Sequence, residues 1–414
     1  MILGNGSKEF PFDIRTGMSW PDIQSGHTVY LRGGVYDLET ALSCTLQGTP
    51  DEPITIRNYP GEIAVLRGDV VQQPSGGYVR WLSEDYGLII DDTLTERTST
   101  ETPTVPGQHS GLYANNIPGM EFINVRIHNV PGTGISWFLN GGGQAYGVVI
   151  TDNGWVGSDR PHGPSVYTSC TDAADTKTFR NCLFLNSFRH VQVGAGDWCY
   201  GTFVFEDITV ANRAFTSGNR FNKNLSVERL FIHNGHPCLG LYIQEDEVAI
   251  NGVALIKDCV IDPYLHDPYG AEAFYLKRWE QATVTGNVFT VDDWTNIELP
   301  GGVYDIQEVV ATTTGQFTNF VPNEYAPGFA SLTVFDFDET GAVAVDVSAL
   351  AESGTVRVRN PMLWDDEYQD IAVVDGMLTV PMTDWTTPAP IGFETPFVGQ
   401  VFSARFGAWI LETL

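Results

Sequence analysis

Three basic side chains in this sequence have the types that a polysaccharide lyase needs. Elimination from an acidic sugar requires a base for the proton at C5 and a cation beside the neighbouring carboxylate, and Lys, Arg, His and Tyr supply these groups. Lys277, one of only five lysines, and Arg189 would neutralise the acidic sugar, with His190 or Tyr242 as the base. The alternative is that these residues are solvated surface side chains.

A glycoside hydrolase would instead need two carboxylates at a defined separation, one on each side of the glycosidic bond. Glu245, in the acidic run at 245–247, and Asp197 are the candidates. An acidic run at a turn is also typical of a solvated corner or of calcium ligands, so Ca²⁺ is the one cofactor left open. We assign no metal ligands, because the six cysteines have no CxxC spacing and His233 and His236 lack a third ligand.

Most of these side chains lie on or beside a family of short strand-like segments. The segments are GISWFL from Gly134, SVYTS from Ser165, HVQV from His190, GLYIQE from Gly240, AFYLKR from Ala273 and NIEL from Asn296. Side chains alternate across a strand, so one set should point into the core: Ile135, Val191, Leu241, Ile243, Phe274 and Leu276.

The alternate set should stand outward with Lys277 on one stacked sheet. With the adjacent Arg278, we predict that its members bind substrate: Tyr167, Gln192, Tyr242, Gln244, Tyr275, Arg278 and Glu298. The tyrosines could stack on sugar rings, and Trp198 and Trp279 would extend this aromatic surface. Outward Tyr also occurs simply because the surfaces of sheets favour it.

An eight-residue repeat organises the middle of the chain. Its copies start 22 to 33 residues apart. They are FINVRIHN from Phe122, YGVVITDN from Tyr146, FRNCLFLN from Phe179, FEDITVAN from Phe205, VERLFIHN from Val227, IKDCVIDP from Ile256 and VTGNVFTV from Val284. A short strand motif at such intervals is typical of a solenoid whose turns bury their faces against one another. The repeat therefore predicts a right-handed parallel β-helix.

The Asn residues that close five of these copies predict a ladder of turns. Asn tolerates left-handed backbone geometry, and stacked copies can bond to one another. The five residues are Asn129, Asn153, Asn186, Asn212 and Asn234.

The chain divides into four parts. Residues 1–26 predict an amino-terminal cap, 27–302 the β-helix, and 303–316 a linker or last rung. Between 317 and 414, alternating strands and turns such as ASLTVFDFD and TVRVRN predict a β-sandwich. The fold class is therefore all-β, a right-handed parallel β-helix solenoid followed by a small C-terminal β-sandwich. In such a core, buried free cysteines are favoured over disulfides.

Three stretches resemble a known group of proteins. TVYLRGGVY followed by GTPDEPITIRNYPGE, and later HGPSVYTSC with TKTFRNCLFLNSFRHVQVGAG, resemble bacterial right-handed parallel β-helix proteins of the pectate-lyase-like superfamily. NFVPNEYAPGFASLTVFDFD resembles the carboxy-terminal sandwich that some of those proteins carry. The resemblance implies the fold and an association with polysaccharides, in a superfamily that includes lyases, hydrolases, epimerases and non-enzymatic spikes.

The composition disfavours some classes of binding partner and bears on where the protein is located. The formal charge of −29 disfavours binding to nucleic acid or to anionic membranes. No apolar run reaches the ~20 residues of a membrane span, and MILGNGSK lacks the apolar centre of a signal peptide. Together with the resemblance, these features predict an extracellular protein that is secreted or released in a virus particle.

We therefore expect a partner that is a polysaccharide or cell-surface glycan. The protein would bind it along the outward strands and act on it as a lyase or hydrolase, that is, as a depolymerase. The alternative is a non-enzymatic phage virion protein, such as a spike, fibre tip or decoration, in contact with other virion proteins. A spike would be a trimer; otherwise the sequence leaves the oligomeric state open, and a bacterial adhesin is a third interpretation.

Overall fold

The computed structural model describes residues 4–68, 70–72, 75–92, 97, 110–158, 161–194, 199–217, 221–235, 239–241, 251–263, 274–290, 295–298, 303–307, 310–311, 313–391, 393 and 399–414. The regular structure of these residues is β-strand except for one short helix, α1 (Ile14–Gly17). The predicted all-β fold is confirmed.

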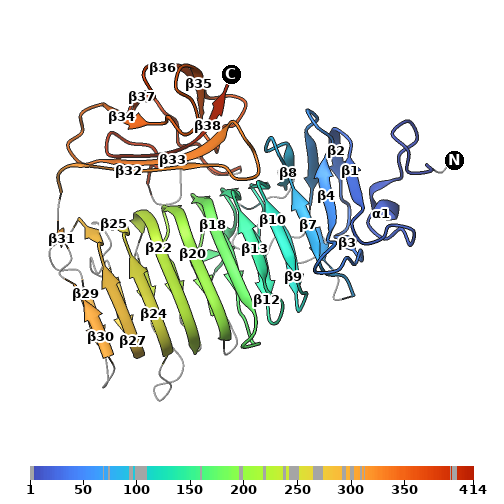
Figure 1. Cartoon of the computed structure of the whole chain (residues 1–414), viewed down its shortest axis with the longest axis horizontal. Coiled ribbons are helices and arrows are strands. Elements are labelled where there is room, and N and C mark those ends of the chain that lie inside the picture. Colours follow the sequence, from blue (N-terminus) through green and yellow to red (C-terminus); the bar gives the residue numbers. More distant parts are fainter. Residues whose placement is uncertain are drawn as a thin grey trace.

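The strands between β1 and β31 wind into a parallel β-helix with three sheets, seen side-on in Figure 1. The first sheet contains β1 (Thr28–Leu31), β4 (Ile54–Asn58), β7 (Val79–Leu82), β10 (Met120–Ile123), β13 (Gly143–Tyr146), β24 (Asn251–Lys257), β27 (Trp279–Thr285) and β30 (Val303–Ile306). The second contains β2 (Gly34–Asp37), β5 (Ala64–Arg67), β8 (Leu88–Asp91), β11 (Arg126–His128), β14 (Val149–Thr151), β25 (Val260–Pro263), β28 (Val288–Phe289) and β31 (Val310–Ala311).

Three long strands run continuously from the first sheet into the second: β18 (Thr176–Leu185), β20 (Cys199–Ala211) and β22 (Asn222–Gly235). The third sheet has ten strands. They are β3 (Leu42–Cys44), β6 (Val70–Gln72), β9 (Leu112–Asn115), β12 (Ile135–Phe138), β17 (Val166–Thr168), β19 (Val191–Val193), β21 (Phe215–Ser217), β23 (Leu239–Leu241), β26 (Phe274–Lys277) and β29 (Thr295–Glu298). A small hairpin of β15 (Trp155–Val156) and β16 (Pro161–His162) projects between β14 and β17.

The apolar places of the repeat stack inside the solenoid. Phe122, Phe179 and Phe205 lie in one inward column of the first sheet, and the rings of Phe179 and Phe205 are parallel with centroids 4.6 Å apart. In the third sheet the predicted inward residues Ile135, Val191, Leu241, Phe274 and Leu276 are all buried, as expected. Ile243 lies outside the described residues. The stacked apolar columns explain why the repeat gives a solenoid.

The buried cysteines fit the same core. Those described are Cys44, Cys170, Cys182, Cys199 and Cys259, and each is buried and outside any disulfide. Cys238 lies outside the described residues.

The predicted Asn ladder is present at the corner after the second sheet. Asn129, Asn186, Asn212 and Asn234 have φ between 52° and 65°. Asn212 donates to Asn186 at 3.1 Å, and Asn234 donates to Asn212 at 3.4 Å. Asn186 continues the ladder by donating to the Asp152 carboxylate at 2.5 Å.

Asn153 is not a rung of this ladder, which corrects the frame of one repeat. Phe122 is in register with Ala145, so that copy starts at Ala145 rather than at the larger and more conspicuous Tyr146. Its closing residue is therefore Asp152, with φ 57°. The Asn153 amide instead donates to the carbonyls of Gly163 and Pro164 at the base of the hairpin, at 2.7 and 3.0 Å.

The carboxy-terminal part has two antiparallel sheets with one shared core, an arrangement consistent with a small sandwich. One sheet contains β32 (Gln316–Pro322), β33 (Phe329–Asp336), β38 (Phe406–Thr413), β35 (Gly354–Arg359) and β36 (Tyr368–Val373). The other contains β34 (Ala342–Asp346) and β37 (Met377–Pro381). Below we call these strands the sandwich.

The sandwich lies along the second sheet, where β32 and β33 cross the coils (Figure 1). Alternate residues of β33 contact successive coils. Ser331 donates to Asn181, the Thr333 hydroxyl lies 2.5 Å from that of Thr209, and Phe335 stacks on Phe231 with centroids 6.2 Å apart. The outward side chains of the second sheet that join the core of the sandwich are apolar: Val149, Leu183, Leu185, Ala211, Phe231 and Val260. One side of the solenoid is therefore an internal interface.

Candidate functional site

The third sheet presents a row of mostly neutral polar and aromatic residues on its outward side. The register of neighbouring strands places them in one column: Tyr113, Ser136, Tyr167, Gln192, Thr216, Gly240 and Tyr275. Adjacent strands are ~4.8 Å apart, so these positions recur along the solenoid axis at about that interval, with Gly240 as a gap in the row of side chains. No described residue of this sheet belongs to the core shared with the sandwich.

The three tyrosines of this column, Tyr113, Tyr167 and Tyr275, are half-buried, and the last two flank more enclosed neighbours. The ring of Tyr167 lies 4.6 Å from that of Phe138, which forms an aromatic pair toward one end of the sheet. Tyr275 lies four strands further along the column. Between them, Gln192 is only 6% exposed, which corrects its predicted position on an open surface. Ser136 and Thr216 of the same column are also buried, at 5% and 9% exposed, so the tyrosines are its more accessible side chains.

Lys277 lies at the same end of the third sheet as Tyr275. Its ammonium is 5.4 Å from the centre of the Tyr275 ring, and its backbone is in register with that of Glu298. Arg278 is the single corner residue between β26 and β27, with φ 61°, and its carbonyl accepts from the Asn251 N–H at 2.6 Å. The structure thus brings together Tyr275, Lys277, Arg278 and the backbone of Glu298.

Arg189 and His190 lie at the opposite end of the strands. Both are half-buried, and Arg189 pairs with Pro164 just before β19. The register places Lys277 three strands along the axis and five residues along the strand from Arg189. At ~4.8 Å per strand and ~3.3 Å per residue, the two positions are roughly 20 Å apart. A single sugar residue therefore does not contact both Lys277 and Arg189.

The hairpin of β15 and β16 adds an aromatic pair near Arg189. The ring of Trp155 stacks on that of His162, with centroids 4.3 Å apart and planes within 10°. Trp155 is not among the residues predicted from the sequence. Its signal is a Trp that opens a Gly- and Pro-rich interruption between two strands.

Several predicted site residues cannot be placed on this surface. Asp197, Tyr242, Gln244 and Glu245, with Trp198, lie outside the described residues, and of Glu298 only the backbone is described. Trp279 does not extend the aromatic surface, because it is fully buried and its indole N–H donates to the Leu241 carbonyl at 3.3 Å. It opens β27 in an inward position.

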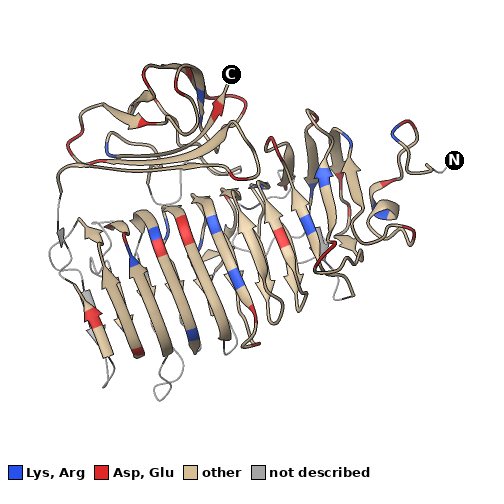
Figure 2. Cartoon of the chain, viewed as in Figure 1, with Lys and Arg blue, Asp and Glu red and all other residues tan. Residues whose placement is uncertain are grey.

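The outward side of the first sheet has a different character. Its cations are matched by carboxylates on neighbouring strands, as the adjacent blue and red bands in Figure 2 show. The pairs are Arg57–Glu84, Arg80–Glu121, Arg180–Glu206, Arg229–Asp207 and Lys257–Glu228, with N–O distances from 2.5 to 3.7 Å. This internal pairing leaves the first sheet poorly suited to an acidic ligand.

Three buried polar clusters have the perturbed groups that often mark active sites, but they are closed. The Lys177 ammonium donates to the carbonyls of Trp137, Leu139 and Ser169, and burial lowers its pKa to about 8. Burial likewise raises the pKa of Asp152 to about 7. Both side chains are at most 1% exposed. They are structural groups of the coils.

The third cluster lies between the second sheet and the sandwich. His233 Nδ1 is 2.7 Å from Asp262, the Thr290 hydroxyl donates to the same carboxylate at 2.7 Å, and the His233 ring stacks on Phe406. Burial raises the pKa of Asp262, but the His233 and Thr290 contacts outweigh it and hold the pKa below its ordinary value. This pair supports the interface.

Within the described part of the chain, no group of three or more His, Cys, Asp or Glu side chains is arranged to hold a metal ion. The same residues include no helix long and apolar enough to span a membrane.

Comparison with known proteins finds no matching family model. No curated protein matches either. Similar solved structures include a GH136 lacto-N-biosidase from Eubacterium ramulus, with 13% identity, a TM-score of 0.42, and coverage of 74% of this chain and 65% of that one. This chain thus spans less than two thirds of that protein.

Two further solved structures are similar. The catalytic domain of a GH87 α-1,3-glucanase has 11% identity, a TM-score of 0.36, and coverage of 68% of this chain and 61% of that one. A mannuronic acid specific polysaccharide family 6 lyase from human gut microbiota has 11% identity, a TM-score of 0.26, and coverage of 68% and 84%. All three are carbohydrate-active enzymes, but at these values the likeness assigns no activity to this chain.

Proposed function

We propose that this protein binds a polysaccharide along the outward side of the third sheet. The proposal depends on one observation: a column of hydroxyl, amide and tyrosine side chains that runs from Tyr113 to Thr216, is interrupted at Gly240 and resumes at Tyr275. A polymer lying along the solenoid axis would meet such groups at every coil from β9 to β26 except that of Gly240. Hydroxyl and amide groups exchange hydrogen bonds with sugar hydroxyls, and the apolar face of a sugar ring packs on tyrosine.

The charged ends of the strands would select the sugar. Lys277 and Arg278 provide cations beside Tyr275, while Arg189 and His190 lie roughly 20 Å away by the register of the strands. An acidic polysaccharide would contact the two ends through different residues of the polymer. Cleavage is the stronger form of the proposal, with Lys277 neutralising a uronate carboxylate and Arg189 binding a more distant part of the chain.

The test is a binding and turnover screen against neutral and acidic polysaccharides, with and without Ca²⁺. Alginate, pectate, chondroitin and capsular glycans serve as probes, with ultraviolet absorbance for lyase products and reducing ends for hydrolysis. We expect Tyr167→Ala or Tyr275→Ala to weaken binding by up to about tenfold, since an aromatic contact contributes roughly 0.5–1.5 kcal/mol.

Tyr200→Ala is the matched control, because Tyr200 is 45% exposed and lies at the start of β20 in the first sheet. Equal loss of affinity in Tyr200→Ala and Tyr275→Ala would refute binding at the third sheet. So would unchanged affinity in both third-sheet variants.

The non-enzymatic alternative, a virion spike or other particle component outside the cell, would use the same surface without turnover. It differs in its assembly, because a spike would be a trimer. Binding without product, together with a trimeric mass in sedimentation, would favour this alternative over a depolymerase.

A further inference from the structure

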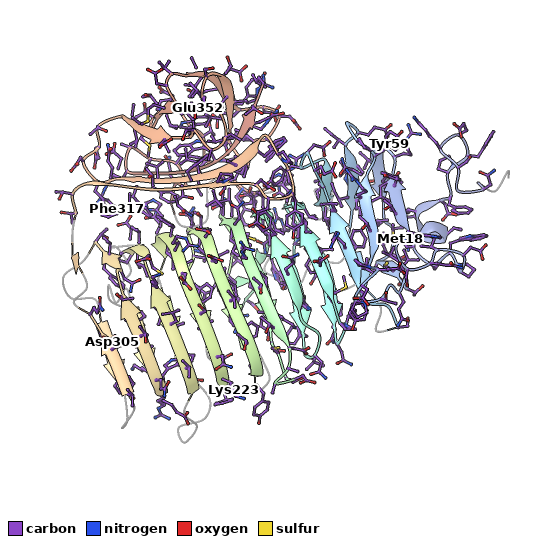
Figure 3. All side chains as sticks on the ribbon, in the orientation of Figure 1. Met18, Tyr59, Lys223, Asp305, Phe317 and Glu352 are labelled. Atoms are coloured by element: carbon purple, nitrogen blue, oxygen red, sulfur yellow. The ribbon has the colours of Figure 1, made fainter. Side chains whose placement is uncertain are left out.

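The loop that joins β12 to β13 contains an Asn–Gly pair, Asn140 and Gly141, with the asparagine exposed. The loop lies at the edge of the first sheet where its strands begin. Gly143, which opens β13, is in register through β18 and β20 with Leu225 of β22. Lys223, labelled in Figure 3, therefore lies at the same edge of the solenoid. In such a pair the glycine nitrogen can attack the asparagine side chain, because glycine has no Cβ to hinder a close approach.

Two side chains of the next coil contact the two atoms that this attack involves. The Asp175 carboxylate accepts a hydrogen bond from the Gly141 N–H at 2.6 Å, within the reach of a general base. The Thr171 hydroxyl donates to Oδ1 of Asn140. Both residues belong to the turn between β17 and β18. A base thus faces the attacking nitrogen, and a donor faces the oxygen on which negative charge would develop.

The backbone on both sides of Asn140 is held in place. Gly141 has φ 105°, a conformation that other residues rarely adopt, and a Cβ at this position would lie 1.9 Å from the Ile117 carbonyl oxygen. On the other side, the Leu139 N–H donates to the Ser169 hydroxyl at 2.9 Å, and the Leu139 carbonyl accepts from the buried Lys177 ammonium at 3.1 Å. The loop is therefore fixed where the base and the donor can act on it.

We infer that Asn140 is a site of self-catalysed deamidation. The Gly141 nitrogen gives its proton to Asp175 and forms a bond to Cγ of Asn140, while the Thr171 hydroxyl stabilises the charge on Oδ1. The bond from Cγ to Nδ2 then breaks, Asp175 returns the proton to the leaving nitrogen, and ammonia departs from a cyclic succinimide. Water opens this ring at either carbonyl, which leaves aspartate or isoaspartate at position 140. This inference is independent of the proposed glycan binding.

Other Asn–Gly pairs of the described chain have different contacts. The N–H of Gly154 donates to the Val130 carbonyl at 2.8 Å, and a carbonyl oxygen does not take up the proton. The Asn153 side chain is fully buried and is held by backbone carbonyls. Asn251, which precedes another glycine, is also fully buried. Asn140 should therefore react faster than these asparagines in the folded protein.

The test is to follow the five Asn–Gly pairs of the full-length chain by mass spectrometry of its proteolytic peptides during incubation at neutral pH. We expect Asn140 to react at least about tenfold faster in the folded chain than in the same chain unfolded in guanidinium chloride, because a positioned base accelerates proton removal. Asn153 should show the reverse order. A rate at Asn140 that is equal or lower in the folded chain would overturn the inference.

Asp175→Asn tests the base, because it keeps a hydrogen-bond acceptor beside the Gly141 N–H but does not take up the proton. We expect the rate at Asn140 to fall at least about tenfold. The remaining rate should rise in proportion to the hydroxide concentration, whereas the wild-type rate should depend less on pH. An equal pH dependence in the two proteins would overturn the assignment of Asp175 as the base.

Thr171→Val removes the donor and should slow the reaction at least about tenfold. Asp172→Asn is the matched control, because the Asp172 carboxylate is exposed on the same turn and accepts from the Ala174 N–H at 2.9 Å. Its rate at Asn140 should equal that of the wild-type chain, and all three variants should keep the wild-type melting temperature. Equal slowing in Asp172→Asn and Asp175→Asn would overturn the inference, since it would trace the effect to the charge of the turn.

Discussion

The second and third sheets belong to the same coils but present opposite surfaces. Outward positions of the second sheet are apolar, as at Leu183 and Phe231, and they merge with the core of the sandwich. Outward positions of the third sheet are hydroxyls, amides and tyrosines, as at Thr216, Gln192 and Tyr275, and none joins that core. The backbone geometry is the same in both. The inward residues of a coil determine the fold, and the outward residues determine what each side contacts.

Substitutions in the two sheets should also have different effects, on folding stability in the second sheet and on ligand binding in the third. Removing a side chain from the second sheet should leave a cavity between two parts of the protein, with a large cost in folding free energy. Removing one of the half-buried outward side chains of the third sheet, such as Tyr167, Tyr275 or Lys277, should cost little stability and change ligand binding instead. Three experiments test this division.

The largest expected effect comes from Phe231→Ala in the second sheet. Phe231 is 5% exposed and stacks on Phe335 of the sandwich. Truncation of a buried Phe costs about 3–5 kcal/mol, measured as the free energy of unfolding in urea. The matched change in the third sheet, Tyr275→Ala, should cost less than about 1 kcal/mol. Equal costs for the two variants would contradict the division between the sheets.

A pH-dependent effect is expected at the corner between the two sheets. Burial raises the pKa of Asp152 to about 7. With this pKa the carboxyl is protonated in the folded state below about pH 7, whereas in the unfolded chain it ionises near pH 4, so its favourable contribution is complete below about pH 4 and is lost as pH rises through 7. Asp152→Asn should therefore stabilise the protein by roughly 2–4 kcal/mol at pH 8 and by little near pH 4.

His128, whose Nδ1 lies 3.8 Å from the Asp152 carboxylate, should act in the opposite sense. Partial burial, with the nearby charges of Arg126 and Arg97, lowers its pKa to about 4, so its contribution is complete above about pH 6.5 and is lost as pH falls toward 4. The Asp152→Asn variant should keep this acid-side loss. Thermal unfolding from pH 4 to 8 measures both effects. A stability gain from Asp152→Asn that is the same at pH 4 and pH 8 would exclude titration of Asp152 as its cause.

The smallest expected effect is on ligand selectivity. Lys277 is a half-buried cation beside Tyr275, and Lys277→Gln removes its charge while keeping a polar side chain. Affinity for an acidic polysaccharide should fall about fivefold, corresponding to ~1 kcal/mol, and affinity for a neutral one should not change. The difference should shrink at high salt. Calorimetric titrations at two ionic strengths measure it, and an equal loss for both ligands would argue against a role for the charge.

The parts of the structure that were predicted best are those that arise from repeating features of the sequence. The repeat starting at Phe179 or Phe205 identifies inward columns that the structure confirms, because an apolar residue must return to the same interior position in every coil. The copy assigned to Tyr146 was shifted by one residue. Its true inward residue is Ala145, and a small side chain gives a weak apolar signal.

The site was less predictable, because outward positions carry no packing constraint that repeats along the chain. Alternation places Tyr167, Tyr275 and Lys277 on one side, but it does not reveal that Gln192 is 6% exposed. Alternation also does not predict the distance between Arg189 and Lys277, because that distance depends on the number of coils between them. The stack of Trp155 on His162 depends on a hairpin outside the repeat.

The position of β33 across several coils has a consequence for cooperativity. A solenoid held only by contacts between neighbouring turns can open turn by turn from either end. Here Phe329 contacts Tyr86, while Ser331, Thr333 and Phe335 of the same strand hold three later coils. Opening any one of these coils breaks contacts to a strand that all of them share. The joined coils should therefore exchange their amide hydrogens as one unit, whereas the coil of β1, which lies beyond these contacts, should fray independently.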